Sequence, residues 1–185
     1  EFGGPDNNKE FITEASVSSL DALKTALDDP NITTITLTAD IDLTGDLTID
    51  RDVTIMGAAT ANAGTKGGYG FKAPISNGYK VTVNSDASVT FTNITFTNGG
   101  YALTAENYAK TLTIENCKFV ASSEVDTGTG FDNGAIQVTT NGGTVKIDNN
   151  EFTGPQGSTQ DPTFLDIQGV NSTRDLTATL TVTNN

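Results

Sequence analysis

One eight-residue stretch governs the interpretation of this chain: Val89-Thr-Phe-Thr-Asn-Ile-Thr-Phe96. The same arrangement returns as Leu112-Thr-Ile-Glu-Asn-Cys-Lys-Phe119 and Val145-Lys-Ile-Asp-Asn-Asn-Glu-Phe152, and Leu180-Thr-Val-Thr-Asn-Asn185 begins it again. Each copy alternates apolar and polar residues, reaches an Asn, and then carries a Phe. Because side chains alternate between the two faces of a strand, each copy predicts two short strands that face one core and meet at an Asn bend. The chain is therefore an array of repeats.

Stacking these repeats as successive coils would align equivalent residues in columns. The predicted structural ladder consists of Asn93, Asn116, Asn149, Asn184, Phe96, Phe119 and Phe152. We interpret both columns as structural and not as a binding site. Asn150 occupies the same repeat position as Ile94 and Cys117, which predicts a buried amide. Because a buried amide needs partners, we expect it to join Asn185 in a second polar ladder.

The segment 16–29 departs from the period of two. Its apolar residues recur at helical spacing: Val17, Leu20, Leu23, Ala26 and Leu27. Ser18 is the expected N-cap, and Pro30 ends the helix. The sequence thus predicts a flexible lead-in or N-terminal strand at 1–15, a capping helix at 16–29, and a parallel β-helix at 30–185 that ends in mid-coil. We expect the helix to cover the apolar end of the first coil.

This pattern resembles the pectate-lyase-like superfamily of right-handed parallel β-helices. The resemblance rests on the helix, on the Asn-Cys-x-Phe and Asn-Asn-x-Phe repeats, and on the strands Ile35-Thr-Leu37, Leu47-Thr-Ile49 and Val53-Thr-Ile-Met-Gly57. It is closest to the non-catalytic adhesive domains of bacterial surface proteins. It implies an all-β, right-handed, single-stranded parallel β-helix with one N-terminal capping α-helix, located outside the cell or at its surface.

Charge and composition exclude several partners. The chain has 23 acidic and 10 basic residues and a net charge of -13, which would repel nucleic acid. It contains no apolar run long enough to cross a bilayer, so membrane insertion is not expected. Cys117 is the single cysteine, which rules out an internal disulfide framework. Its apolar neighbours predict a small buried side chain.

The residues for catalysis are not evident. The sequence holds no His and only two Arg, Arg51 and Arg174, so the hydrolase groups that the resemblance would bring cannot be assembled. The best lyase candidate surrounds Arg51 with acidic residues: Asp40, Asp42, Asp46, Asp50 and Asp52. We interpret them as turn residues, with Arg51 neutralised by its neighbours. We therefore expect no enzyme and no cofactor.

Calcium is the one metal considered. Carboxylate oxygens are its preferred ligands, so it could bind the acidic group around Arg51 or a second set: Asp126, Asp132, Asp161 and Asp166. The spacing of the second set matches no known calcium loop. We therefore assign no metal ligand from the sequence.

Two non-catalytic functions remain. In the first, the chain is an adhesive or structural module that recognises a host or matrix glycan or protein through the loops at 57–80, 120–135 and 153–164. In the second, it is a subunit of an extracellular filament that self-associates head to tail through an uncapped end. A polysaccharide lyase is a distant third. Four tyrosines offer either a sugar platform or, as we favour, loop packing: Tyr69, Tyr79, Tyr101 and Tyr108.

Overall fold

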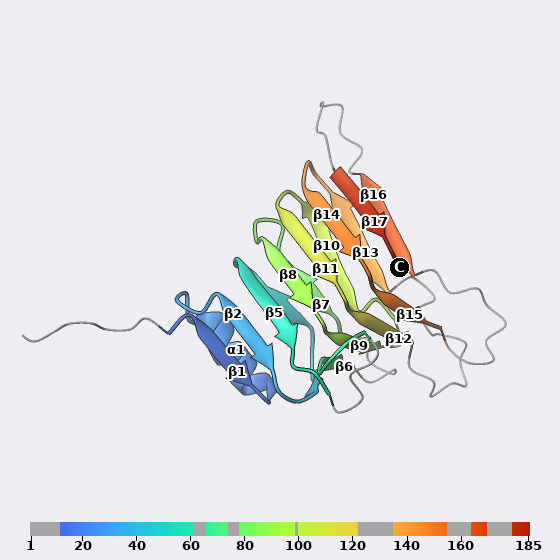
Figure 1. Ribbon diagram of the computed structural model, residues 1–185. Helices are drawn as coiled ribbons and strands as arrows, with labels where there is room; N and C mark the ends of the chain where they lie inside the picture. The colour runs from blue at the N-terminus through green and yellow to red at the C-terminus, as the bar shows by residue number, and fades with distance from the viewer. Residues whose placement is uncertain are drawn as a thin grey trace, which may run out of the picture.

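The computed structural model describes residues 12–60, 66–73, 78–98, 100–121, 135–154, 164–169 and 179–185. These residues form one helix and seventeen strands, which pair in parallel throughout three sheets. Five successive coils each contribute one strand to sheet A, then one to sheet B and one to sheet C, and the first and last described strands belong to sheet A alone. The coils stack along one axis (Figure 1). The fold is therefore a parallel β-helix, as the sequence predicts.

Sheet A comprises β1 (Glu14–Val17), β2 (Thr34–Leu37), β5 (Val53–Gly57), β8 (Val89–Thr92), β11 (Thr111–Glu115), β14 (Thr144–Asp148) and β17 (Thr179–Thr183). Sheet B comprises β3 (Ile41–Asp42), β6 (Phe71–Lys72), β9 (Thr95–Asn98), β12 (Lys118–Ala121) and β15 (Glu151–Thr153). Sheet C comprises β4 (Leu47–Ile49), β7 (Val81–Val83), β10 (Leu103–Tyr108), β13 (Ile136–Thr140) and β16 (Leu165–Gly169).

The register between coils follows the sequence repeat. Leu112 of β11 pairs with Val89 on one side and with Val145 on the other, and Val145 pairs in turn with Leu180. Alternate residues of β8, β11 and β14 are buried in one continuous apolar core. The repeat alignment made from the sequence is therefore confirmed for sheet A.

Phenylalanine rings form a column behind sheet B. The rings of Phe96 and Phe119 are 4.8 Å apart and nearly parallel, and those of Phe119 and Phe152 are 5.0 Å apart. The column extends to Phe71, whose ring lies 5.6 Å from that of Phe96, and then to Ile41 in register. Sequence comparison missed Phe71, because a long insertion replaces the Asn bend in its coil.

The bend between sheets A and B has one conformation in four coils. The left-handed residues there are Asn93, Asn116, Asn149 and Asn184, with φ between 54° and 55°. Asparagine tolerates this conformation better than most residues. The Asn149 Nδ2 donates to Asn116 Oδ1 at 2.6 Å, whereas Asn93 Nδ2 donates to Gly57 O and Asn184 Nδ2 to Asp148 Oδ1. The bends are thus tied across coils by side-chain amides.

Asn150 lies within the core and is 1% exposed. Its Nδ2 donates to Ile114 O and to Asn185 Oδ1, each at 3.0 Å, and its Oδ1 accepts from Cys117 N at 2.9 Å. The prediction of a second polar ladder with Asn185 is confirmed. Every polar atom of this buried side chain has a partner, which offsets its desolvation.

Cys117 is fully buried, as predicted. Burial raises the pKa of its thiol from 9.0 to about 12. We expect the native chain to resist thiol reagents at neutral pH and the unfolded chain to react, because the thiolate is the reactive form. Since folding favours the protonated thiol, its contribution to stability is complete below pH 9.0 and is lost as the pH approaches 12. Labelling of the native chain at the unfolded rate would contradict this burial.

The helix is shorter than predicted. The structure places it at α1 (Leu20–Asp28), behind β1 and β2 at the N-terminal end of the solenoid (Figure 1). Its N-cap is Ser19, whose side chain accepts from Ala22 N, and not Ser18. Val17 belongs to β1, where it is buried. Its spacing from Leu20 also fits the apolar face of a helix, which is why the sequence assigned it to the helix. The buried face of α1 is Leu23, Ala26 and Leu27, which pack on the core.

Candidate functional site

A strap of residues 66–70, which precedes β6, crosses the bends of several coils. Gly68 N donates to Asn93 O at 2.6 Å, and Gly67 N donates to Asn116 O at 3.0 Å. The Lys66 ammonium continues this line, with Nζ 3.2 Å from Asn150 O. The strap therefore runs along the axis of the solenoid and ties coils that are far apart in sequence.

Glycines allow the strap to lie directly on sheet B. Gly67 has a φ of 84°, and a Cβ there would lie 2.5 Å from Thr95 Oγ1 and 2.8 Å from Lys118 Cβ. A Cβ on Gly70 would overlap the carbonyl oxygen of Thr95. Side chains at these positions would push the strap outward, so glycine is required for the close approach.

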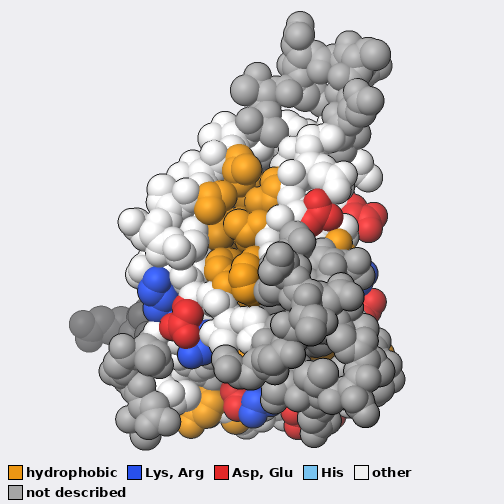
Figure 2. Space-filling model, turned by 90° about the vertical axis from the view of Figure 1, so that its right-hand side faces the viewer, with side chains coloured by type: hydrophobic (Ala, Val, Ile, Leu, Met, Phe, Trp, Pro, Cys, Tyr) orange, Lys and Arg blue, Asp and Glu red, His pale blue; other side chains and the backbone are white. Residues whose placement is uncertain are grey.

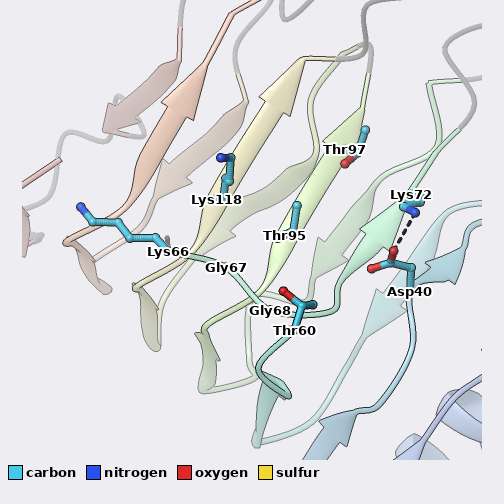
Figure 3. Close-up of a pocket in the computed structure, with 9 residues that line it drawn as sticks. All are labelled: Asp40, Thr60, Lys66, Gly67, Gly68, Lys72, Thr95, Thr97 and Lys118. Carbon is cyan, nitrogen blue, oxygen red and sulfur yellow. Dashed lines mark ion pairs between the residues drawn. The ribbon is translucent and has the colours of Figure 1, made fainter. Parts of the chain in front are cut away.

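The strap and the outer face of sheet B enclose a cleft of about 240 Å³, which we call the sheet B cleft. It is lined by Asp40, Thr60, Lys66, Gly67, Gly68, Lys72, Thr95, Thr97 and Lys118. Figure 3 shows Thr95 and Thr97 between Lys72 on one side and Lys118 on the other, while Lys66 extends away from Lys72. The lining is polar, with three cations and one carboxylate.

Ion pairs orient two of the lysines. Lys72 Nζ lies 2.6 Å from Asp40 Oδ2, and the hydrogen bond with Asp40 raises the pKa of the lysine. Lys118 Nζ lies 2.8 Å from Glu151 Oε1 on the next strand. Both lysines remain accessible, with side chains 50% and 26% exposed respectively. Pairs this exposed contribute little to stability, so the lysines can exchange partners at low cost.

Three of the five acidic residues proposed as a lyase cluster bind backbone amides of the next coil. The Oδ1 atoms of Asp40, Asp46 and Asp52 each accept from a backbone amide one coil away: those of Gly70, Lys80 and Ser88. Among the residues that the structure describes, no three His, Cys, Asp or Glu side chains gather closely enough to hold a metal ion. These carboxylates therefore tie neighbouring coils together.

Arg51 caps the helix, contrary to its interpretation as a turn residue neutralised by neighbours. Its Nε donates to Leu27 O at 2.7 Å, and its Nη2 donates to Ala26 O at 2.9 Å. These carbonyls belong to the last turn of α1, where the helix dipole favours a cation. The guanidinium is thus held by hydrogen bonds at the N-terminal end of the solenoid.

We expect Arg51→Gln to lower the free energy of unfolding by about 1–2 kcal/mol, because the last carbonyls of α1 lose charged donors. Chemical denaturation measures the change. Lys24→Gln, at an exposed position of the same helix, is the matched control and should shift stability by less than about 0.5 kcal/mol. Equal effects of the two substitutions would contradict the capping role.

The four tyrosines considered as a sugar platform have different surroundings in the structure. Tyr108 is buried, and its hydroxyl donates to Ala87 O at 2.6 Å, so it does not belong to a sugar platform. Tyr69 and Tyr79 pack partly buried against the core. On the outer face of sheet C, Tyr101 OH donates to Asp166 Oδ2 at 3.2 Å.

Several residues singled out in the sequence lie outside the described residues: Asp126, Asp132, Asp161, Arg174 and most of the loops at 120–135 and 153–164. The same holds for residues 61–65 and 74–77 of the loop at 57–80.

The last described coil presents an apolar face. Leu180 and Val182 of β17 are 50% and 43% exposed. Four half-buried side chains continue this face: Phe152, Phe164, Leu165 and Ile167. Figure 2, which views the molecule from the side of the last coils, shows apolar side chains in a band between polar margins. We call this surface the apolar end.

The sheet B cleft was not predicted from the sequence. Lys118 occupies the polar position of the repeat that precedes the Phe, where the other copies carry Thr95 and Glu151. Lys66 and Lys72 follow an insertion that breaks the alignment. The only available signal was the closely spaced Gly67, Gly68 and Gly70, which now explain the close approach of the strap.

The structure is a parallel β-helix with a polar cleft on the outer face of sheet B. Residues 14–153, more than half of the chain, match the pectate lyase-like adhesive domain family. The chain belongs to this family, as the sequence resemblance indicated. Comparisons with curated proteins and with solved structures gave no significant match.

No helix among the described residues has the length and apolar character needed to span a membrane.

Proposed function

We propose that the chain is an extracellular adhesive module of a bacterial surface protein, and that its adhesive surface is the sheet B cleft. Membership of the adhesive domain family supports the class of function. The observation that carries the location is the gathering of Lys72 and Lys118 around one cleft in a chain of net charge -13. A solenoid suits this role, because every coil holds its outer side chains on a rigid sheet.

Adhesion is tested with beads that carry the chain and flow over epithelial cells, extracellular matrix and living bacteria. We expect retention well above that of albumin-coated beads on at least one surface, and less retention for the Lys72→Gln/Lys118→Gln chain. Retention equal to albumin on all three surfaces would reject the adhesive function. Retention that the double substitution leaves unchanged would reject the cleft as its location.

The proposal includes the absence of catalysis. A lyase would use a basic side chain beside carboxylates that hold calcium, whereas Arg51 is bound to the carbonyls of α1. Incubation with polygalacturonate and calcium should therefore yield no unsaturated product, as measured by ultraviolet absorbance. Product formation above that of a heat-denatured sample of the chain would show an enzyme.

A filament subunit is the second candidate, and the apolar end favours it. Exposed Leu180 and Val182 would gain stability by packing against another copy of the chain. In this case light scattering should show a mass that rises with concentration, and Leu180→Asp should restore the monomer. A monomer at every concentration would exclude the filament and leave the apolar end to be covered by another segment.

A further inference from the structure

We propose that the sheet B cleft binds an anionic polysaccharide, whose carboxylate or sulfate groups contact Lys72 and Lys118. This inference rests on the proposed adhesive function and names its ligand class. It follows from the charge, the spacing and the chemistry of the residues that line the cleft.

The charge of the cleft opposes that of the chain. The described residues include eight Lys and Arg, and three of them line this cleft together with a single carboxylate, Asp40. At physiological ionic strength charges are screened within about 8 Å. Two carboxylates lie next to these lysines, because Asp40 pairs with Lys72 and Glu151 pairs with Lys118. A bound anion would take the place of these two carboxylates, and acidic residues farther away would contribute little. The cleft is a place where an acidic protein can hold an acidic ligand.

The spacing of the lysines favours an extended ligand. Lys72 of β6 pairs with Thr97 of β9, and Lys118 of β12 pairs with Thr95 of the same strand. Two strand spacings, roughly 9.5 Å, separate the strands of the two lysines, which are also offset by two residues, roughly 6.6 Å, along the strand direction. Their backbones therefore lie roughly 11–12 Å apart. A single small anion contacts one lysine at this separation, whereas a polymer with repeated charges contacts both. The hydroxyls of Thr95 and Thr97 lie between, where sugar hydroxyls would meet them.

The lining chemistry favours a glycan over an acidic peptide. The cleft residues are all Asp, Thr, Lys or Gly, so no apolar pocket is present in this lining to receive peptide side chains. Peptides also bind by adding a strand to a sheet edge. The strands β6, β9 and β12 each have neighbours on both sides, so their edges are occupied.

The Asp40 carboxylate occupies the position beside Lys72 that we propose for an anionic group of the ligand. Its carboxylate holds Lys72 at 2.6 Å and must yield when a ligand anion enters. Asp40→Asn removes this competing charge and keeps an oxygen that can accept from Gly70 N. A purely structural ion pair predicts no gain in binding from this substitution, whereas a ligand site predicts tighter binding.

Isothermal titration of the full chain with four polymers tests the proposal. The probes are dextran sulfate, hyaluronan, uncharged dextran and polyglutamate. We expect binding of dextran sulfate or hyaluronan, and the stronger of the two identifies sulfate or carboxylate as the preferred group. Lys72→Gln and Lys118→Gln should each weaken it about tenfold, since each removes a charge-assisted hydrogen bond. Asp40→Asn should strengthen it about threefold or more, because the competing carboxylate is gone.

The matched control is Lys146→Gln, because Lys146 lies on sheet A and forms an ion pair with Glu115 like those of the cleft. It should change affinity less than about twofold. Thermal unfolding shows that each variant is folded. Equal weakening by Lys146→Gln, equal binding of dextran, preference for polyglutamate, or no binding to either acidic glycan would overturn the inference. Beads retained on cells despite such a result would leave the adhesive function intact.

Discussion

Phe119→Ala should lower the free energy of unfolding by about 3–5 kcal/mol, which is the usual cost of removing a buried aromatic ring. Phe119 is fully buried, and its ring lies between those of Phe96 and Phe152. The substitution removes apolar contacts to two coils and leaves a cavity that the stacked backbones cannot close. Urea denaturation, with the transition followed by circular dichroism, measures the loss.

Val120→Ala is the control for this substitution, because Val120 is the next residue of β12 and is only half-buried. It should cost less than about 1 kcal/mol, because much of its side chain remains in water in the folded state. A loss of less than about 1 kcal/mol for Phe119→Ala would place the ring at the surface and contradict the register of sheet B.

Asn150→Leu should cost about 2–6 kcal/mol, although leucine has a similar size and is more apolar. The change leaves Cys117 N and Ile114 O without their partner inside the core. Each buried group that loses its hydrogen bond costs about 1–3 kcal/mol. Denaturation under the conditions used for Phe119→Ala makes the two values comparable.

Asn141→Leu provides the comparison, since Asn141 is exposed in a turn. Its effect should stay within about 0.5 kcal/mol. If Asn150→Leu stabilised the chain, burial of the Asn150 amide would lower the free energy of unfolding, and its hydrogen bonds between coils would not offset that loss. The second polar ladder would then lack the energetic role that its hydrogen bonds indicate.

Most of the fold could be predicted from the sequence, because the residues that define each coil lie close together in the chain. An apolar residue at every second position and an Asn that tolerates positive φ are requirements of each coil, so they recur at Asn93, Asn116 and Asn149. The helix boundary was wrong because Val17 satisfies both a strand and a helical stripe. Ser18 and Ser19 are adjacent, and only the backbone geometry decides which one caps.

The candidate site could not be predicted from the sequence, because its residues are distant in the chain and come together only in the folded structure. Lys72 and Lys118 are 46 positions apart, and the insertion before β6 hides the register that places them on one face. The strap adds contacts that depend on tertiary structure alone, such as Lys66 Nζ with Asn150 O across 84 residues. Arg51 was misinterpreted for the same reason, because its partners Ala26 and Leu27 precede it by a full coil.

The most direct test of the account is a map of backbone amide chemical shifts while a short hyaluronan or dextran sulfate oligosaccharide is titrated into the labelled chain. We predict that the largest changes fall on the sheet B cleft: Gly67, Gly68, Thr95, Thr97 and Lys118. Amides of sheet A around Lys146 should stay unchanged. Changes centred on sheet A or sheet C would contradict the assignment of the cleft as the adhesive surface. No changes at high oligosaccharide concentration would contradict the binding of an acidic glycan.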